Sequence, residues 1–246
     1  KVALIRKKAM LWVIEISKKK KKKTENTNKT EKIYKNVRII LRLHAKQDKI
    51  YCIQENNRGY IMEKIYETAY AKINLGLDVL GKRSDGYHEV RMVMQSVGLS
   101  DAVEIEEGEG LVVETDHSGL AGGPDNLAWK AAELLARCCG KIPNVHIRLN
   151  KKIFLAAGLA GGSSDAAAVM RGLSRLWQLD LTAPELEKLA AELGSDIPFC
   201  ITGGTALAEG RGEILTELPE APELLLVLAK PKLEVATGWV YGNFRQ

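Results

Sequence analysis

Residues 154–168 read FLAAGLAGGSSDAAA, a glycine-rich segment around which the rest of the chain is organised. It opens with small residues and glycines, which let backbone N–H groups approach a ligand closely. It continues through Ser163 and Ser164 into a helical pattern, because apolar residues recur every three or four positions from Ala166 to Trp177. A glycine-rich loop that leads into a helix can hold phosphate, since free N–H groups and the positive end of the helix dipole face the anion. Either serine can cap the helix, or reach a phosphate or its metal ion.

Two common nucleotide motifs do not fit this loop. It does not end in Gly-Lys-Ser or Gly-Lys-Thr, so it is not a Walker A loop, and its glycine spacing differs from the dinucleotide fingerprint. The simpler alternative is a tight turn before a packed helix, with no ligand at all. The loop by itself leaves both interpretations open.

Charge divides the chain into two unlike parts. Residues 1–61 contain 18 Lys and Arg against 5 Asp and Glu, whereas the remainder contains 18 basic and 26 acidic residues. The six consecutive lysines at 18–23 repel one another, so we expect residues 1–61 to be a basic, low-complexity, disordered extension. A nucleic-acid-binding arm is the alternative, but no interleaved aromatic residues support it. The acidic body predicts no broad nucleic-acid surface.

Cysteine usage and hydropathy suggest a compartment. The four cysteines include an adjacent pair, Cys138 and Cys139, and no C-x-x-C motif occurs, so we predict neither a metal site nor a disulfide. Free thiols favour a reducing, cytoplasmic location. No apolar run reaches the roughly 18 residues that a membrane span requires, and we expect no membrane association.

Periodicity predicts alternating strands and helices in the body. A strand at 69–79 alternates apolar and polar residues, which puts Lys72 and Asn74 on one face. Further strands are predicted at 90–97, 145–149, 203–209 and 224–228, with a hairpin that joins 103–106 to 111–115. Helices are predicted after Asp125 as N-cap, after a capping box at Thr182, and after Ser195. The apolar face of the first helix is predicted to include Cys138. The nearly continuous apolar run at 224–229 predicts a strand that is buried on both faces.

Four residues outside the loop are candidates for chemistry. Asp196 lies where a helix begins, and the helix dipole would keep it ionised as a proton acceptor; its other interpretation is a capping aspartate. Lys72 could orient a hydroxyl and keep that carboxylate charged, or be a solvated strand lysine. Tyr87 and His88 follow an Asp-Gly turn and could stack on a base and hydrogen-bond to it, or be ordinary surface residues.

Together these motifs resemble the GHMP kinase superfamily, over residues 63–244. The matching segments are Ala71-Lys72-Ile73-Asn74-Leu75, Arg83-Ser84-Asp85-Gly86-Tyr87-His88, Pro124-Asp125-Asn126-Leu127, residues 157–168, and Gly194-Ser195-Asp196-Ile197-Pro198. The resemblance implies an α+β fold. An N-terminal ATP-binding domain, similar to domain 2 of ribosomal protein S5, would occupy residues 62–220, and the start of a ferredoxin-like domain residues 221–246.

The resemblance also implies a reaction and its residues. ATP with Mg²⁺ would phosphorylate a hydroxyl of a small cytosine-bearing alcohol, with Asp196 as general base and Lys72 beside it. Asn74, Tyr87 and His88 would contact this substrate, and Asn126 would lie near the adenosine. Mg²⁺ would neutralise the phosphates, with Ser164 as a possible contact. The ATP phosphates would be wrapped by Phe154, Leu155, Ala156, Ala157, Gly158, Leu159, Ala160, Gly161, Gly162, Ser163 and Ser164.

Three departures from the family pattern accompany this resemblance. Phe154 stands where the family often has proline, and Ala160 stands where it often has glycine, which matters if that position needs a positive φ. Nothing after Leu224 supplies the third glycine-rich motif, so we expect the second domain to be incomplete. The alternatives are a homoserine- or mevalonate-type kinase of the same superfamily, or an inactive fragment whose basic tail binds nucleic acid. We expect a monomer or a homodimer.

Overall fold

A computed structural model describes residues 12–15, 40–41, 50–55, 61–231 and 240. Most of the predicted basic extension, residues 1–61, lies outside this part of the chain. The short strands β1 (Trp12–Glu15), β2 (Ile40–Leu41) and β3 (Ile50–Glu55) are the portions of it that are described.

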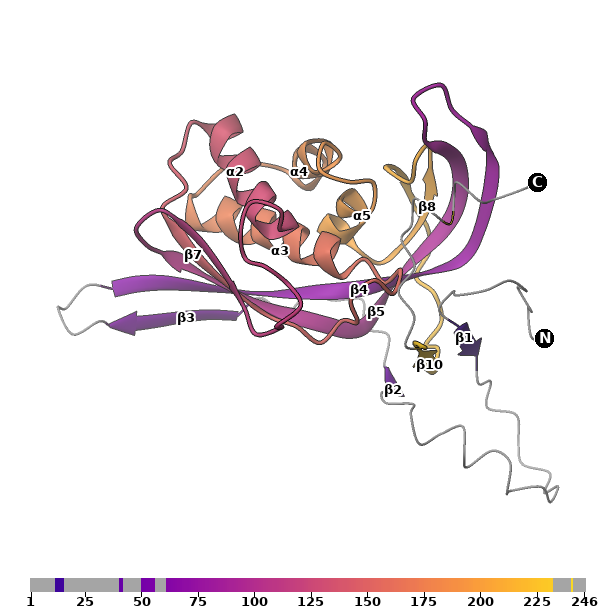
Figure 1. Cartoon of the computed structure of the whole chain (residues 1–246), viewed down its shortest axis with the longest axis horizontal. Helices are drawn as coiled ribbons and strands as arrows, with labels where there is room; N and C mark the ends of the chain where they lie inside the picture. Colours follow the sequence, from indigo (N-terminus) through magenta and orange to yellow (C-terminus); the bar gives the residue numbers. More distant parts are fainter. Residues whose placement is uncertain (1–11, 16–39, 42–49, 56–60, 232–239, 241–246) are drawn as a thin grey trace, which may run out of the picture.

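The strands of the described residues form a seven-stranded sheet, which is built on two long strands (Figure 1), and a separate three-stranded sheet. β4 (Ile61–Lys82) and β5 (His88–Glu107) pair antiparallel along most of their length. In the seven-stranded sheet the strand order is β3-β4-β5-β7-β6. β7 pairs with the later part of β5, β8 pairs with its earlier part, and β9 pairs with β8. The remaining strands are β6 (Leu111–Thr115), β7 (Val145–Asn150), β8 (Thr205–Glu209) and β9 (Ile214–Glu217).

The sheet corrects two sequence predictions. Residues 90–97 and 103–106 belong to one continuous strand, β5, rather than to two. The predicted hairpin of 103–106 with 111–115 is wrong, because β7 lies between these segments. It pairs antiparallel with β5 and parallel with β6. Local turn signals at Gly108 and Gly110 could not reveal a strand inserted from about 40 residues further along the chain, since nonlocal pairing carries no local pattern.

Four helices of the described region cover one face of this sheet (Figure 1). They are α2 (Leu127–Cys139), α3 (Gly161–Leu176), α4 (Ala183–Ala190) and α5 (Ile197–Thr202). α3 is the central helix, and the predicted apolar residues Val169, Met170 and Leu173 are fully buried. The predicted capping box at Thr182 is confirmed, since its backbone N–H donates to the Glu185 carboxylate at 2.8 Å.

The start and the end of α2 differ from expectation. Asn126, not Asp125, is the N-cap, and its side-chain oxygen accepts the Ala128 N–H at 2.9 Å. Cys138, expected on the buried face, is exposed, because the buried face follows Ala131, Leu134 and Leu135.

A smaller apolar cluster lies on the side of β4 and β5 away from the helices (Figure 1). Ala71 and Ile73 of β4 meet Leu226 and Leu228 of β10 (Leu226–Ala229) there. β10 pairs antiparallel with β1 and β2. The prediction of a strand buried on both faces is wrong, because burial alternates along β10. The alternation shows that one face of β10 covers the cluster while the other face is half-buried.

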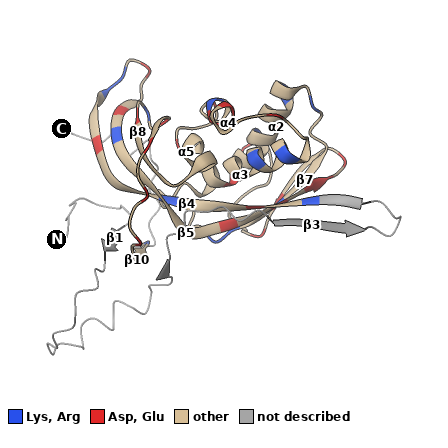
Figure 2. Ribbon diagram, turned by 180° about the vertical axis from the view of Figure 1, so that it is seen from behind, with Lys and Arg blue, Asp and Glu red and all other residues tan. Residues whose placement is uncertain are grey.

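Charges of both signs are interspersed over the described elements (Figure 2). None of the helices in the described ranges is long and apolar enough to cross a membrane.

Candidate active site

A β-bulge brings Lys72 to the helix side of the sheet. The register of β4 against β5 shifts between Tyr70 and Lys72. Before the shift Ala69 packs in the core beneath the helices, whereas after it Ala71 and Ile73 pack in the opposite cluster. Residues 97–99 of β5 lie opposite the single β4 residue Ala71 at this shift, and such an irregularity changes which side chains face which side. The bulge therefore places Lys72 under the helices.

Lys72 is buried and joins three segments of the chain. Only 4% of the residue is exposed. Its ammonium donates to Asn74 Oδ1 at 3.1 Å and lies 3.4 Å from Asp196 Oδ1. Its backbone N–H donates to the Leu159 carbonyl in the glycine loop at 3.1 Å. The predicted shared face of Lys72 and Asn74, and the approach of Lys72 to Asp196, are therefore present in the structure.

Asp196 occupies the N-cap position of α5 but makes no capping hydrogen bond with its side chain. Its side chain is 36% exposed, in contrast to the Lys72 side chain at 5%. The carboxylate is thus paired with a buried cation on one side and accessible from outside on the other. That combination suits a group that accepts a proton from a bound hydroxyl.

The glycine loop has a left-handed backbone at every second residue. φ is 49° at Ala156, 71° at Gly158 and 57° at Ala160, and α3 begins at Gly161. Alternation of left-handed and ordinary residues turns successive N–H groups toward one side and forms an anion-binding nest. The departure noted at Ala160 therefore falls on a position with positive φ. Leu159 is buried as a whole residue and packs in the cluster with Ala71 and Leu226.

The two serines of the loop do not cap α3. Ala160 is the N-cap, and no side chain caps this helix. The Ser164 hydroxyl is buried, donates to the Tyr70 carbonyl at 2.6 Å and lies 3.4 Å from Cys200 Sγ. Ser164 thus fastens α3 to β4 beside the bulge, and its hydroxyl is committed there rather than to a metal ion. Burial raises the pKa of the Cys200 thiol to about 12, which keeps it protonated.

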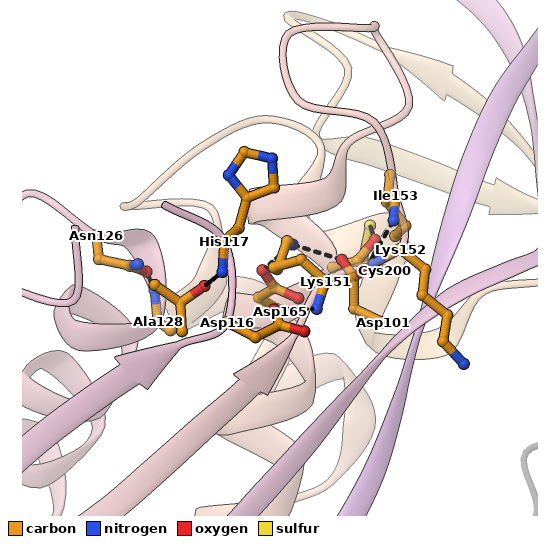
Figure 3. Close-up of polar contacts among 12 residues, drawn as sticks. Asp101, Asp116, His117, Asn126, Ala128, Lys151, Lys152, Ile153, Asp165 and Cys200 are labelled. Atoms are coloured by element: carbon orange, nitrogen blue, oxygen red, sulfur yellow. Dashed lines mark hydrogen bonds and ion pairs between the residues drawn. The ribbon is translucent and has the colours of Figure 1, made fainter. Parts of the chain in front are cut away.

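Asn126 lies next to the glycine loop, but its side chain is already bonded. A Cβ on Gly162 would lie 3.4 Å from Leu127 Cδ1, so the first turns of α2 and α3 are adjacent. The Asn126 amide donates to the Ala121 carbonyl at 2.8 Å. The Asn126 side-chain oxygen caps α2 by accepting the Ala128 N–H (Figure 3). Asn126 would therefore affect a nucleotide indirectly, because its side chain fixes the loop before α2.

Tyr87 and His88 lie at the turn between β4 and β5. Asp85 Oδ1 accepts the Tyr87 N–H at 3.0 Å, which confirms the predicted Asp-Gly turn. The Tyr87 side chain is 53% exposed, and the Arg211 guanidinium lies 4.8 Å from the centre of its ring. His88 begins β5, opposite Lys82. Sequence reasoning missed Arg211, because its partner is more than 100 positions away.

A buried ion cluster beneath the loop was also missed. The Lys151 ammonium bonds to the carboxylates of both Asp101 and Asp165, and all three side chains are almost fully buried (Figure 3). Burial raises the pKa of the Asp165 carboxyl from 3.8 to about 7; Lys151 lowers it and Asp101 raises it further. The only sequence signal was a lysine and an aspartate on either side of the loop.

Comparison with known proteins defines the class. Residues 126–204 match the family described as "GHMP kinases N terminal domain", and they contain the glycine loop and Asp196. The chain therefore carries the N-terminal domain of GHMP kinases. It is 50% identical over 185 residues to 4-diphosphocytidyl-2-C-methyl-D-erythritol kinase of Acetivibrio thermocellus, over 75% of this chain and 65% of that relative. It is 53% identical over 179 residues to the kinase of the same name from Synechococcus sp. (strain JA-3-3Ab), over 72% of this chain and 58% of that relative.

Solved structures agree with this class. A crystal structure of 4-(cytidine 5'-diphospho)-2C-methyl-D-erythritol kinase superposes with a TM-score of 0.60 at 36% identity, over 74% of this chain and 65% of that chain. Mevalonate pyrophosphate decarboxylase from Streptococcus pyogenes shares the fold, with a TM-score of 0.50 at 14% identity, over 63% of this chain and 51% of that chain. The chain spans less than two thirds of the length of the relatives named above. Since the fold also occurs in a decarboxylase, the acceptor must be argued from side chains.

The left-handed alanine at the N-cap of α3 predicts a stability effect. An L-residue in this conformation costs about 1–2 kcal/mol, and glycine avoids most of it. We expect Ala160→Gly to raise the free energy of unfolding by about 0.5–1 kcal/mol, net of the larger backbone entropy of glycine. Chemical denaturation measures this change.

Ala157→Gly is the matched control, because Ala157 lies in the same loop and does not have positive φ. It should lower the free energy of unfolding by about 0.5–1 kcal/mol. Equal losses of stability in both variants would show that Ala160 carries no backbone strain.

The raised pKa of Asp165 predicts a pH dependence of stability. Between its ordinary pKa of 3.8 and about 7, the folded chain holds a proton that the unfolded chain has released. This group's stabilising contribution is therefore full at low pH and is lost as the pH rises through about 7. Asp165→Asn cannot titrate, so its melting temperature relative to wild type should increase from about pH 5 to about pH 8.

Asp125→Asn, at an exposed position beside α2, is the control and should show a constant difference across the same range. A constant difference for Asp165→Asn as well would refute the raised pKa.

Proposed function

We propose that the chain takes part in ATP-dependent phosphorylation of the 2-hydroxyl of 4-diphosphocytidyl-2-C-methyl-D-erythritol, in the non-mevalonate route to isoprenoid precursors. The observation that carries the proposal is the pair of Lys72 and Asp196, 3.4 Å apart and tied through the Lys72 backbone to a loop shaped for an anion. The names of the relatives support the choice of substrate.

In the proposed reaction Asp196 accepts the proton of the 2-hydroxyl. The oxygen then bonds to the γ-phosphorus of ATP, the bond to the β–γ bridging oxygen breaks, and ADP leaves with the electron pair. Lys72 pairs with the Asp196 carboxylate, and with Asn74 it orients the hydroxyl. Holding both reactants in line supplies much of the acceleration in such reactions.

The glycine loop is proposed to bind the triphosphate through the N–H groups of residues 156–162. These donors are preorganised, because alternate left-handed residues fix their direction before the ligand arrives. Mg²⁺ would accompany ATP and neutralise its phosphates. No group of three His, Cys, Asp or Glu residues suited to a metal ion occurs among the residues described, so the phosphates themselves would supply most ligands.

Specificity for a cytidyl substrate is proposed to reside in the β4–β5 turn. The exposed Tyr87 ring offers a surface on which a base can stack, and the neighbouring Arg211 keeps the ring in place. His88 would hydrogen-bond to the cytosine and Asn74 would contact the alcohol. Asn126 would act near the adenosine by holding the loop before α2.

The domain boundaries also remain proposals. Residues 62–220 would form the ATP-binding domain, and residues 221–246 would begin a ferredoxin-like second domain, of which β10 is the described strand. The oligomeric state, monomer or homodimer, stays a prediction, as does the cytoplasmic location.

A substrate panel tests the proposed acceptor. The protein as its gene encodes it, with any residues beyond Gln246, should phosphorylate the cytidyl substrate with a kcat/KM at least about 100-fold above that for homoserine or mevalonate. Phosphorus NMR of the product locates the new phosphate. A preference for homoserine or mevalonate would overturn the acceptor but keep the class. RNA binding that is lost on deletion of residues 1–61, without any phosphorylation, would overturn the kinase.

Replacement of the proposed base tests the mechanism. Asp196→Asn keeps the shape of the side chain but accepts a proton far more weakly, so kcat should fall by about 10²–10⁴-fold with little change in either KM. Steady-state kinetics measure this, with circular dichroism to verify folding.

Asp180→Asn, an exposed aspartate after α3, is the control and should retain wild-type kcat. A near-normal kcat for Asp196→Asn would remove this residue from the mechanism.

A further inference from the structure

Three charged side chains from separate segments are buried together beneath the glycine loop. Asp101 comes from β5, Lys151 follows the last residue of β7, and Asp165 lies in α3. Their side chains are 0%, 1% and 1% exposed, and the ammonium bonds to both carboxylates (Figure 3). Removing charges from water costs several kcal/mol per ion, and pairing often does no more than offset that cost. A net gain in stability is therefore a weak explanation for the presence of this cluster.

The cluster is attached to both ends of the loop. At the entry, Asp101 accepts the backbone N–H groups of Lys152 and Ile153, the latter at 2.8 Å. At the exit, Lys151 holds Asp165, which lies in the second turn of α3. A Cβ on Gly161 would meet the Ile153 side chain at 3.0 Å and lie 3.7 Å from Lys151 Nζ, so the cluster packs against the first residue of the helix.

We propose that Asp101, Lys151 and Asp165 are positioning residues that hold the entry and exit of the glycine loop at a fixed separation, and thereby set its affinity for the triphosphate. This inference rests on the proposed function, since it assigns the loop to ATP. The three side chains are buried and act through the backbone between them. They keep alternate N–H groups aimed at one point, which lowers the entropy lost when the anion binds.

The cluster has an internal weakness that fits a positioning role. Asp165 Oδ1 is buried and has no hydrogen-bond partner within the described part of the chain. The raised pKa of this carboxyl agrees with that environment. A group selected for stability alone would be better satisfied, because an orphaned buried acceptor costs about 1–3 kcal/mol. The bond from Lys151 to Asp165 is the contact that links the entry of the loop to its exit.

A second, partly buried ion cluster on the same helix provides a comparison. Glu67 of β4 pairs with Arg171 at 3.0 Å and with Arg175, and the Glu67 side chain is 7% exposed. These contacts lie on the later turns of α3, away from its first turn. Loss of Glu67 should destabilise the fold without changing the loop.

The experiment compares Asp165→Ala, Asp165→Asn and Glu67→Ala. Asp165→Ala leaves a charge-balanced pair of Lys151 and Asp101, so folding should survive. Calorimetry measures the Kd for the imido analogue of ATP without any alcohol substrate. Hydrogen exchange with mass spectrometry follows the amides of residues 152–160 without nucleotide. We expect Asp165→Ala to raise Kd and speed loop exchange at least about tenfold, or 1.4 kcal/mol.

Asp165→Asn can still accept a hydrogen bond from Lys151, so it should stay within about threefold of wild type in both measurements. Glu67→Ala should lower the melting temperature but leave both unchanged. The proposal is overturned if Asp165→Ala leaves loop exchange at the wild-type rate, or if Glu67→Ala moves both readouts equally. If wild type fails to bind the analogue, the proposed function fails, and loop exchange alone decides whether the cluster positions the loop.

Discussion

The site depends on how one buried lysine is accommodated. An ammonium that is withdrawn from water needs a carboxylate and hydrogen-bond acceptors close by. Lys72 finds them in Asp196 and Asn74, while its own N–H holds Leu159 of the glycine loop. The lysine reaches this position because a β-bulge turns it under the helices. Strand, loop and α5 are therefore joined at a single residue, and displacement of α5 would leave a buried charge without its carboxylate.

Besides Lys72, two further sets of contacts hold the glycine loop in place. Ser164 bonds to the strand that carries Lys72, and the cluster of Asp101, Lys151 and Asp165 fixes both loop ends. Rigid support of this kind suits the binding of a flexible triphosphate, because the donors need no reorganisation. The part of the molecule proposed to select the acceptor, Tyr87 and its neighbours, lies on a different turn. Under the proposed function, phosphate binding and acceptor choice are carried by separate elements, which agrees with a fold shared by enzymes of different reactions.

Local patterns predicted much of this arrangement. The helix after the loop, the alternation that pairs Lys72 with Asn74 and the turn at Asp85 all rest on neighbouring residues, and each is present. The hairpin prediction failed because β7 enters between β5 and β6 from far along the chain. The left-handed Ala160 and the buried Lys151 were beyond prediction for a similar reason. An alanine gives no sign of positive φ, and a lysine with two distant carboxylate partners reads as an exposed charge.

The most direct test is a crystal structure of the protein with the imido analogue of ATP and 4-diphosphocytidyl-2-C-methyl-D-erythritol. The distances to measure run from the substrate 2-hydroxyl oxygen to Asp196 and to the terminal phosphorus of the analogue. We expect hydrogen-bond contact of about 2.6–3.2 Å with the carboxylate and an approach of about 3–3.5 Å to the phosphorus. The triphosphate should lie on the N–H groups of residues 156–162. A triphosphate bound elsewhere, or a 2-hydroxyl that faces away from Asp196, would contradict the proposed mechanism.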